Sequence, residues 1–124
     1  MKRMLRPSTA LVALSLLPSA GLALDLSRAV IHAPLNPTIV ERKAVQMLVE
    51  EVEKRTQFRL ATTGAGSPVI TLKRGSGPAD GYRLVVTATG VEITGNDARG
   101  LLFGAGRLLR EARLERQHFT IADN

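Results

Sequence analysis

The pattern of apolar and polar residues predicts a run of strands through the middle of the chain. Residues 69–72 form a short apolar run rich in β-branched side chains, which is typical of a buried strand. Residues 82–88 and 91–94 alternate apolar and polar positions, the period of a strand with one buried face. Because only Thr89-Gly90 separates these two segments, they are predicted to form a hairpin.

A strand and a helix are predicted ahead of this region. The strand is the apolar run 29–33, which Pro34 ends, and a further edge strand is a candidate at 58–60. The helix is expected to open at Asn36-Pro37, where proline has no amide to leave unbonded, and to end near Thr56. Its apolar positions recur at helical spacing: Ala44, Val45, Leu48, Val49 and Val52. Its other side is charged: Glu41, Arg42, Lys43, Glu50, Glu53 and Lys54.

A second helix is predicted after the hairpin. Its apolar stripe is Leu101, Leu102, Ala105, Leu108, Leu109 and Ala112. Gly95 is expected to take a positive φ at the corner before it, and Asn96 and Asp97 to cap its first amides. Gly100 and Gly104 fall on one face, although each glycine costs roughly 1 kcal/mol against Ala inside a helix. We therefore expect the helix backbone to lie close against a sheet.

The resulting order, β-α-β-β-β-α, defines an α+β fold. The first βαβ unit should have parallel strands, and the hairpin adds antiparallel pairing, so the sheet is predicted to be mixed. Each helix has one apolar stripe, which places both helices on one face of that sheet. The sequence thus predicts a two-layer domain with a mixed four- to five-stranded sheet and two helices on one face.

Four segments together resemble a known family. They are Gly81–Val86, Gly90–Ile93, Asn96–Gly104 and Arg107–Arg110. This series is similar to the small N-terminal domain that precedes a (β/α)₈ catalytic barrel in α-glucuronidases, β-N-acetylhexosaminidases and their relatives. The resemblance implies a non-catalytic accessory domain of an exported glycoside hydrolase acting in carbohydrate breakdown. It also implies that the general acid and its partner lie in the barrel, which this sequence lacks.

The domain organisation follows from this resemblance. The predicted parts are a signal peptide at 1–23, the α+β glycoside-hydrolase N-terminal-like domain at 24–118, and the start of a linker to an absent catalytic domain at 119–124. In relatives an Ile-x-Asp sequence leads into the barrel, and Ile121-Ala122-Asp123 is similar to its start. The chain is therefore expected to be truncated before the barrel. Phe119 and Ile121 are expected to be exposed or poorly ordered where the barrel would dock.

The first residues predict export. Lys2, Arg3 and Arg6 form a positive n-region, and residues 10–17 form an apolar h-region that is too short to span a bilayer. The protein is expected to be secreted or periplasmic, with no membrane contact after cleavage. Removing the three basic residues lowers the formal net charge from +6 to +3, which disfavours a nucleic-acid partner. The chain has no cysteine, so it has no disulfide framework.

No metal or cofactor is predicted. His32 and His118 are the two histidines, and they belong to no zinc-binding spacing. His32 is expected to be a partly buried, hydrogen-bonded strand residue. Two glycine pairs resemble fragments of phosphate-binding loops but lack the rest of the motif, so they are interpreted as turn or packing glycines: Gly64 with Gly66, and Gly104 with Gly106.

No catalytic residue is assigned either, and whether the chain belongs to an enzyme stays open. Glu41 and Glu92 come from different elements and suggest no carboxylate pair for glycoside hydrolysis. Asp97 and Arg99 could meet an anion at a helix start, but capping and solvation are the preferred interpretation. Four arginines crowd the predicted end of the second helix and could touch an acidic partner, although a solvated face is favoured: Arg107, Arg110, Arg113 and Arg116.

Carbohydrate remains a candidate partner, but the sequence equips the chain poorly for it. Sugar pockets use exposed aromatic rings, and this chain has no tryptophan. Its aromatic residues are Phe58, Tyr82, Phe103 and Phe119. The alternative function is a stand-alone exported domain that binds a polysaccharide or a protein.

Cleavage after Gly21-Leu22-Ala23 should give a mature protein that begins at Leu24. Intact-mass analysis of protein recovered from the cell envelope or the medium checks this. An unprocessed form beginning at Met1 in those fractions would contradict it.

Overall fold

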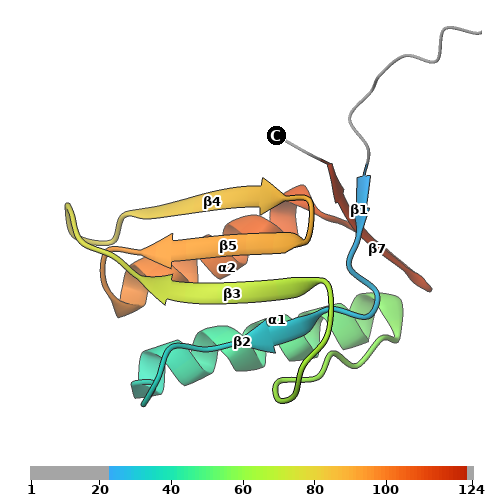
Figure 1. Cartoon of the computed structure of the whole chain (residues 1–124), viewed down its shortest axis with the longest axis horizontal. Helices are drawn as coiled ribbons and strands as arrows, with labels where there is room; N and C mark the ends of the chain where they lie inside the picture. Colours follow the sequence, from blue (N-terminus) through green and yellow to red (C-terminus); the bar gives the residue numbers. More distant parts are fainter. Residues whose placement is uncertain (1–22, 123–124) are drawn as a thin grey trace, which may run out of the picture.

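The computed structural model describes residues 23–122, which contain two helices and seven strands (Figure 1). The helices are α1 (Ile39–Thr56) and α2 (Ala98–Glu111). The strands are β1 (Ala23–Asp25), β2 (Val30–His32), β3 (Val69–Arg74), β4 (Tyr82–Thr87), β5 (Gly90–Gly95), β6 (Arg113–Glu115) and β7 (His118–Ala122). Nearly all of the predicted signal peptide, together with Asp123 and Asn124, lies outside the described residues.

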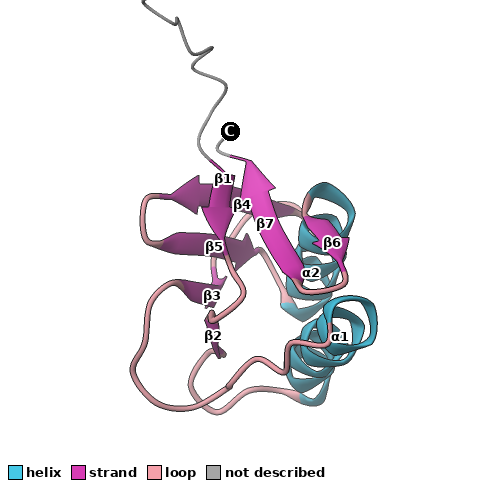
Figure 2. Ribbon diagram, turned by 90° about the vertical axis from the view of Figure 1, so that its right-hand side faces the viewer, coloured by secondary structure: helices cyan, strands magenta, loops and turns pink. Residues whose placement is uncertain are grey.

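The main sheet has four strands in the order β2-β3-β5-β4. Strands β2, β3 and β5 run parallel, and β4 pairs antiparallel with β5 around a turn at Ala88-Thr89. Both helices cover one face of this sheet, as the edge-on view in Figure 2 shows. The structure therefore confirms the α+β class, the mixed sheet, the parallel β2-α1-β3 unit, the hairpin and the shared helix face.

A second sheet, which was not predicted from the sequence, has three antiparallel strands in the order β1-β7-β6. It brings the first and last described residues together, because Ala23 pairs with Ala122. Phe119 is fully buried and Ile121 is 3% exposed, so the expectation that these two side chains are exposed is wrong. The reason is that β7 alternates inward and outward residues beside β1. The linker expected from residue 119 thus starts inside a strand of the fold.

Two element boundaries also differ from the prediction. Helix α1 is capped by Thr38 rather than opened by Asn36-Pro37, since Asn36 has a φ of 47° and cannot begin a helix. Residues 58–60 are not a strand. The chain there makes a single parallel bridge, between Ala61 and Val30, while Leu60 is buried in the core.

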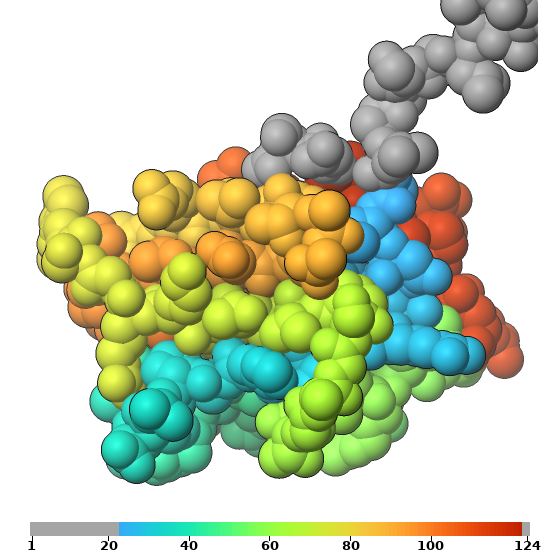
Figure 3. Space-filling model, viewed as in Figure 1, coloured from blue at the N-terminus to red at the C-terminus, as the bar shows by residue number. Residues whose placement is uncertain are grey.

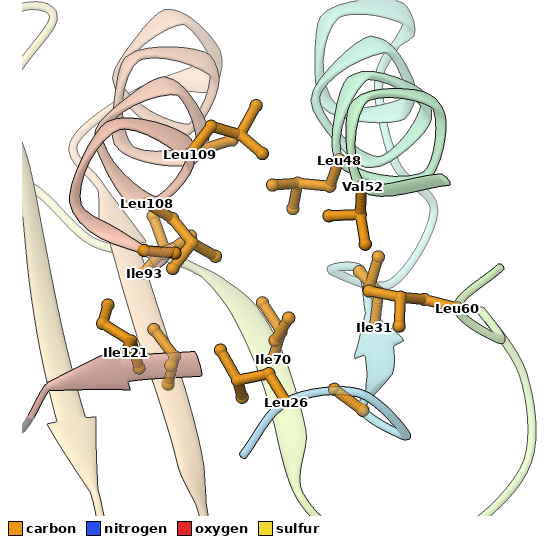
Figure 4. Packing of buried hydrophobic residues seen from close by; sticks show 14 of the residues in the cluster. Leu26, Ile31, Leu48, Val52, Leu60, Ile70, Ile93, Leu108, Leu109 and Ile121 are labelled. Atoms are coloured by element: carbon orange, nitrogen blue, oxygen red, sulfur yellow. The ribbon is translucent and has the colours of Figure 1, made fainter. Parts of the chain in front are cut away.

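The hydrophobic core lies between the helices and the main sheet (Figure 4). Side chains from both helices point toward the sheet, and the residues labelled there are Leu48 and Val52 of α1, Leu108 and Leu109 of α2, and Ile31, Ile70 and Ile93 of the sheet. Leu26 and Ile121 extend the same cluster to the second sheet. One core thus holds both sheets together.

Glycines set how closely α2 approaches the sheet. A Cβ on Gly100 would collide with the carbonyl oxygen of Gly81, and a Cβ on Gly104 with Cγ2 of Ile93. This confirms the predicted close packing. Gly95, in contrast, has no positive φ, so that expectation is wrong. Glycine is required at position 95 for another reason: a Cβ there would collide with the backbone nitrogen of Leu101 in the first turn of α2.

Replacing Gly104 with Ala should lower the free energy of unfolding by roughly 1–3 kcal/mol, because the added methyl overpacks the contact with Ile93. Gly106→Ala is the matched control in the same helix, since its nearest neighbour would be the flexible end of Arg110 at 3.4 Å. That variant should be neutral or up to about 1 kcal/mol more stable. Urea unfolding followed by circular dichroism measures both, and a stabilised Gly104→Ala variant would contradict the packing argument.

Candidate functional site

The most extensive polar cluster of the described chain lies where β3 ends and α1 begins. Arg74, the last residue of β3, donates two hydrogen bonds to Glu41, from Nε to Oε2 at 2.8 Å and from Nη2 to Oε1 at 2.7 Å. Its Nη2 also donates to the carbonyl oxygens of Leu35 and Asn36, at 3.0 and 3.2 Å. We call this group of Thr38, Glu41, Arg74 and the two carbonyls the Arg74 clamp.

Glu41 has a second task in the clamp. It forms a capping box with Thr38, whose backbone N–H donates to Oε1 of Glu41 at 2.8 Å, while the Glu41 N–H donates to Oγ1 of Thr38 at 3.1 Å. The side chain of Glu41 is only 2% exposed. The helical pattern predicts a solvated position for Glu41, and this prediction is wrong because an ion pair with Arg74 permits burial of the carboxylate.

The electrostatics of Glu41 suit a structural carboxylate. The hydrogen bonds from Arg74, followed by that from the Thr38 N–H, lower the pKa of Glu41 to about 2 against the opposing effect of burial. Glu41 correspondingly raises the pKa of Arg74. A general acid in glycoside hydrolysis needs a raised pKa, whereas the pKa of Glu41 is lowered. Glu41 is therefore unsuited to that role.

Glu92, the other carboxylate considered in the sequence, lies apart from Glu41. Its neighbours Val91 and Ile93 are buried under the helices, so Glu92 projects from the opposite face of the sheet. There it pairs with Lys73 at 3.2 Å. The structure therefore does not bring Glu41 and Glu92 together.

The start of α2 is occupied by a loop of the same chain. Asp97 is the N-cap residue, and its Oδ1 accepts from the Gly100 N–H at 2.7 Å while its Oδ2 accepts from the Asp80 N–H at 2.8 Å. These backbone bonds, that of Asp80 first, lower the pKa of Asp97. Arg99 pairs with Asp80 at 3.4 Å. Capping by Asp97 is confirmed, whereas Asn96 instead donates from Nδ2 to the carbonyl of Pro78.

The histidines and the loop glycines occupy separate places. His32 is exposed rather than partly buried, and its Nε2 lies 3.2 Å from the carbonyl oxygen of Gly64. His118 contacts Thr120 Oγ1 at 3.2 Å. Gly64 is a loop residue with a φ of 95°, and Gly66 packs against Val30. Within residues 23–122, no three acidic or histidine side chains gather as potential metal ligands.

The arginines expected at the end of the second helix are spread over three elements, because α2 ends at Glu111. Arg107 pairs with Glu111 at 2.8 Å and lies 3.5 Å from the Tyr82 hydroxyl. Arg113, in β6, pairs with Glu115 at 3.2 Å. Arg110 occupies the last turn of α2, and Arg116 lies in the exposed turn before β7. They do not form one helical patch.

The aromatic residues are mostly engaged in packing. Phe119 is fully buried, and Phe58 packs against the core. Tyr82 is half-buried beside Gly104. Phe103 is 41% exposed, but the Arg99 guanidinium lies 5.8 Å from its ring centre. This arrangement offers little aromatic surface on which a sugar could stack.

An open groove runs beside α1. It has a volume of about 550 Å³, and its lining residues are Ala33, Arg42, Val45, Gln46, Val49, Glu50, Arg59 and Thr62. Arg59 pairs with Glu53 at 2.8 Å, and Arg42 donates to the Pro37 carbonyl at 2.7 Å. The lining thus combines two aliphatic side chains of α1 with polar and charged groups. Neither helix in the described part of the chain is long and apolar enough to cross a membrane.

Comparison with known proteins identifies the family. Residues 17–123 match the model of glycosyl hydrolase family 20, domain 2. The match spans most of the chain, so this protein belongs to that family and represents a domain of the non-catalytic type found in β-hexosaminidases. No curated protein matches the chain.

Solved structures of family 20 enzymes share the fold. The chain is 24% identical to the β-N-acetylhexosaminidase of Streptomyces coelicolor A3(2), with a TM-score of 0.64, over 85% of this chain and 22% of that one. A mutant Streptomyces plicatus β-hexosaminidase in complex with GlcNAc is 25% identical with a TM-score of 0.67, over 84% of this chain and 22% of that one. The exo β-N-acetylglucosaminidase of Vibrio harveyi in complex with N-acetylglucosamine is 19% identical with a TM-score of 0.59, over 84% of this chain and 17% of that one. The chain thus spans about a fifth of the length of these relatives.

The Arg74 clamp was not predicted from the sequence, although the spacing of two of its residues is visible there. Thr38 and Glu41 have the Thr-x-x-Glu spacing of a capping box, which identifies a helix start directly. Arg74 could not be found in this way, because it lies 33 residues from Glu41 along the chain. Only the fold brings the end of β3 to the start of α1.

Acid should weaken the fold through Glu41. Its folded pKa of about 2 lies below its ordinary value of 4.5, so its contribution is complete above pH 4.5 and is lost as the pH falls toward 2. The contribution is on the order of 3 kcal/mol. Urea unfolding between pH 2.5 and 7 measures it. In Glu41→Gln most of this dependence should disappear, whereas the control Glu50→Gln, an exposed position of the same helix, should keep it. Equal slopes in the two variants would contradict the role of Glu41.

Proposed function

We propose that the chain is the accessory domain of an exported glycoside hydrolase of carbohydrate breakdown, next to a catalytic (β/α)₈ barrel. The observation that carries this proposal is the family match over residues 17–123. Relatives of known structure carry the same domain beside a catalytic domain, and their names describe N-acetylhexosaminidases. The proposed substrate class is accordingly a glycan with terminal β-linked N-acetylhexosamine.

The chemistry of the described residues supports an accessory role. Glycoside hydrolysis needs a carboxylic acid that stays protonated beside the scissile bond. The most buried carboxylate, Glu41, has a pKa of about 2 and is fully bonded to Arg74 and Thr38. Glu92 is paired with Lys73 on the opposite face of the sheet. Neither group is suited to donate a proton to a leaving group, and we assign the chemistry to the neighbouring barrel.

Export is part of the same proposal. It is supported by the basic n-region, the apolar h-region and the small residues before Leu24. A glycan-degrading enzyme meets its polymeric substrate outside the cytoplasm, so a secreted or periplasmic location suits the proposed substrate class.

The 124-residue protein should release no 4-nitrophenol from 4-nitrophenyl N-acetyl-β-D-glucosaminide above the rate without protein. The reason is that Glu41, the buried carboxylate of residues 23–122, is held ionised by Arg74 with a lowered pKa, whereas a general acid must stay protonated. The Streptomyces plicatus enzyme is the positive control for the assay. Turnover that is lost in Glu92→Gln while the fold is retained would overturn the accessory role. Tight binding of soluble N-acetylglucosamine oligomers in calorimetry would instead favour the stand-alone binding domain.

A further inference from the structure

Two large aliphatic side chains are exposed where the loop between β2 and α1 leads into the helix: Leu35 lies in the loop, and Ile39 is the first residue of α1. Leu35 is 85% exposed and Ile39 is 74% exposed, far more than the next exposed large hydrophobics of the described chain, Phe103 and Val85, at 41% and 39%. The loop, residues 33–38, forms a corner of the molecule at the lower left of Figures 1 and 3. Single exposed hydrophobics are common, but two at such exposure only four residues apart are not explained by packing within the domain.

This exposed corner is held rigidly. Arg74 binds the carbonyls of Leu35 and Asn36, and Arg42 binds the carbonyl of Pro37. The capping box fixes Thr38 against Glu41. Because these hydrogen bonds fix both the loop and the first turn of α1, Leu35 and Ile39 are presented in one geometry, and little conformational freedom is lost when a partner covers them. This preorganisation is what allows two aliphatic side chains to serve as anchors of a protein interface.

The surroundings of the two side chains are positively charged. Arg42 and Lys43 follow Ile39 on α1, are exposed, and have no carboxylate within 4.0 Å in the described part of the chain. Glu41, the nearest acidic residue in the sequence, is buried and neutralised by Arg74. A partner surface that receives this corner should therefore have an apolar pocket with acidic groups at its edge. A second copy docking through the same corner would place like charges against each other.

The helix-free face of the main sheet, seen in Figure 3, differs from this corner. It projects Lys73, Arg83 and Glu92 between the strands, and Val85 is its one exposed large aliphatic residue in the described chain. This face has the composition of a solvated surface. The corner at Leu35 and Ile39 is the better candidate for a protein contact.

We propose that Leu35 and Ile39 are the anchors through which this domain docks into an acid-rimmed apolar pocket of the adjacent catalytic domain. The proposal rests on the proposed function, because it takes the catalytic domain of the hexosaminidase as its partner. It adds which residues form the contact and which surface chemistry receives them. The Arg74 clamp then serves to hold the anchors in place for docking.

The absence of cysteine allows a direct test. The 124-residue chain replaces the segment it matches in the Streptomyces plicatus β-hexosaminidase, and Leu35→Cys or Val85→Cys is introduced in this chimera and in the isolated chain. Labelling by N-ethylmaleimide is followed by peptide mass spectrometry. Leu35→Cys should react about tenfold more slowly in the chimera than in the isolated chain, because it enters the core of an interface. Val85→Cys, the control on the helix-free face, should react equally in both.

The possible failures are distinguishable. If the chimera unfolds in two independent thermal transitions, the domain does not dock to a family 20 catalytic domain, and the proposed function fails together with this inference. If it unfolds in one transition but Leu35→Cys reacts as fast as in the isolated chain, the proposed function stands and the anchors are wrong. Replacing Lys43, which makes none of the bonds that hold the loop, with Glu should raise the labelling rate at position 35 in the chimera, and unchanged protection would refute the acidic rim.

Discussion

The close approach of α2 to the main sheet is the constraint on which the rest of this structure depends. Gly100 faces the backbone of Gly81, Gly104 faces Ile93, and Gly95 allows the chain to turn directly into the helix. At this spacing Leu101 and Leu108 become fully buried, and α1 packs beside α2 on the same face. The loop before β4 is also fixed by this corner, because Asn96 and Asp97 bind the backbone of Pro78 and Asp80. A row of residues without side chains thus sets the distance between the two layers.

The main sheet and both helices could be predicted from the sequence because their periodic patterns are long enough to be unambiguous. The second sheet could not, since β1 and β6 have three residues each and β7 five, too few for alternation to be distinguished from a tail. Phe119 was misplaced for that reason. Glu41 was misplaced because residue type alone predicts a solvated position, and only the distant Arg74 makes its burial favourable. Local patterns therefore identified the elements, while the contacts between distant segments came from the fold.

The polar groups of the domain are largely used to hold its own chain. Asp97 caps α2, Glu41 and Thr38 cap α1, and Arg74 joins the end of β3 to the loop before α1. In residues 23–122 every buried side-chain nitrogen or oxygen has a hydrogen-bond partner. This use of polar residues agrees with membership of a non-catalytic domain family, in which a stable shape is required of the domain and the chemistry belongs to another part of the enzyme.

The pairing of β1 with β7 has a mechanical consequence. Ala23 lies opposite Ala122, so the two ends of the described chain leave the domain side by side from one edge. A force that separates these ends acts across the ladder at its outermost rung, and the rungs at Ala23, Leu24 and Asp25 then break one after another instead of sharing the load. The next bond under tension is that from the Leu26 N–H to the Phe119 carbonyl, where both side chains are fully buried. The domain therefore yields easily over three residues and resists where its core begins.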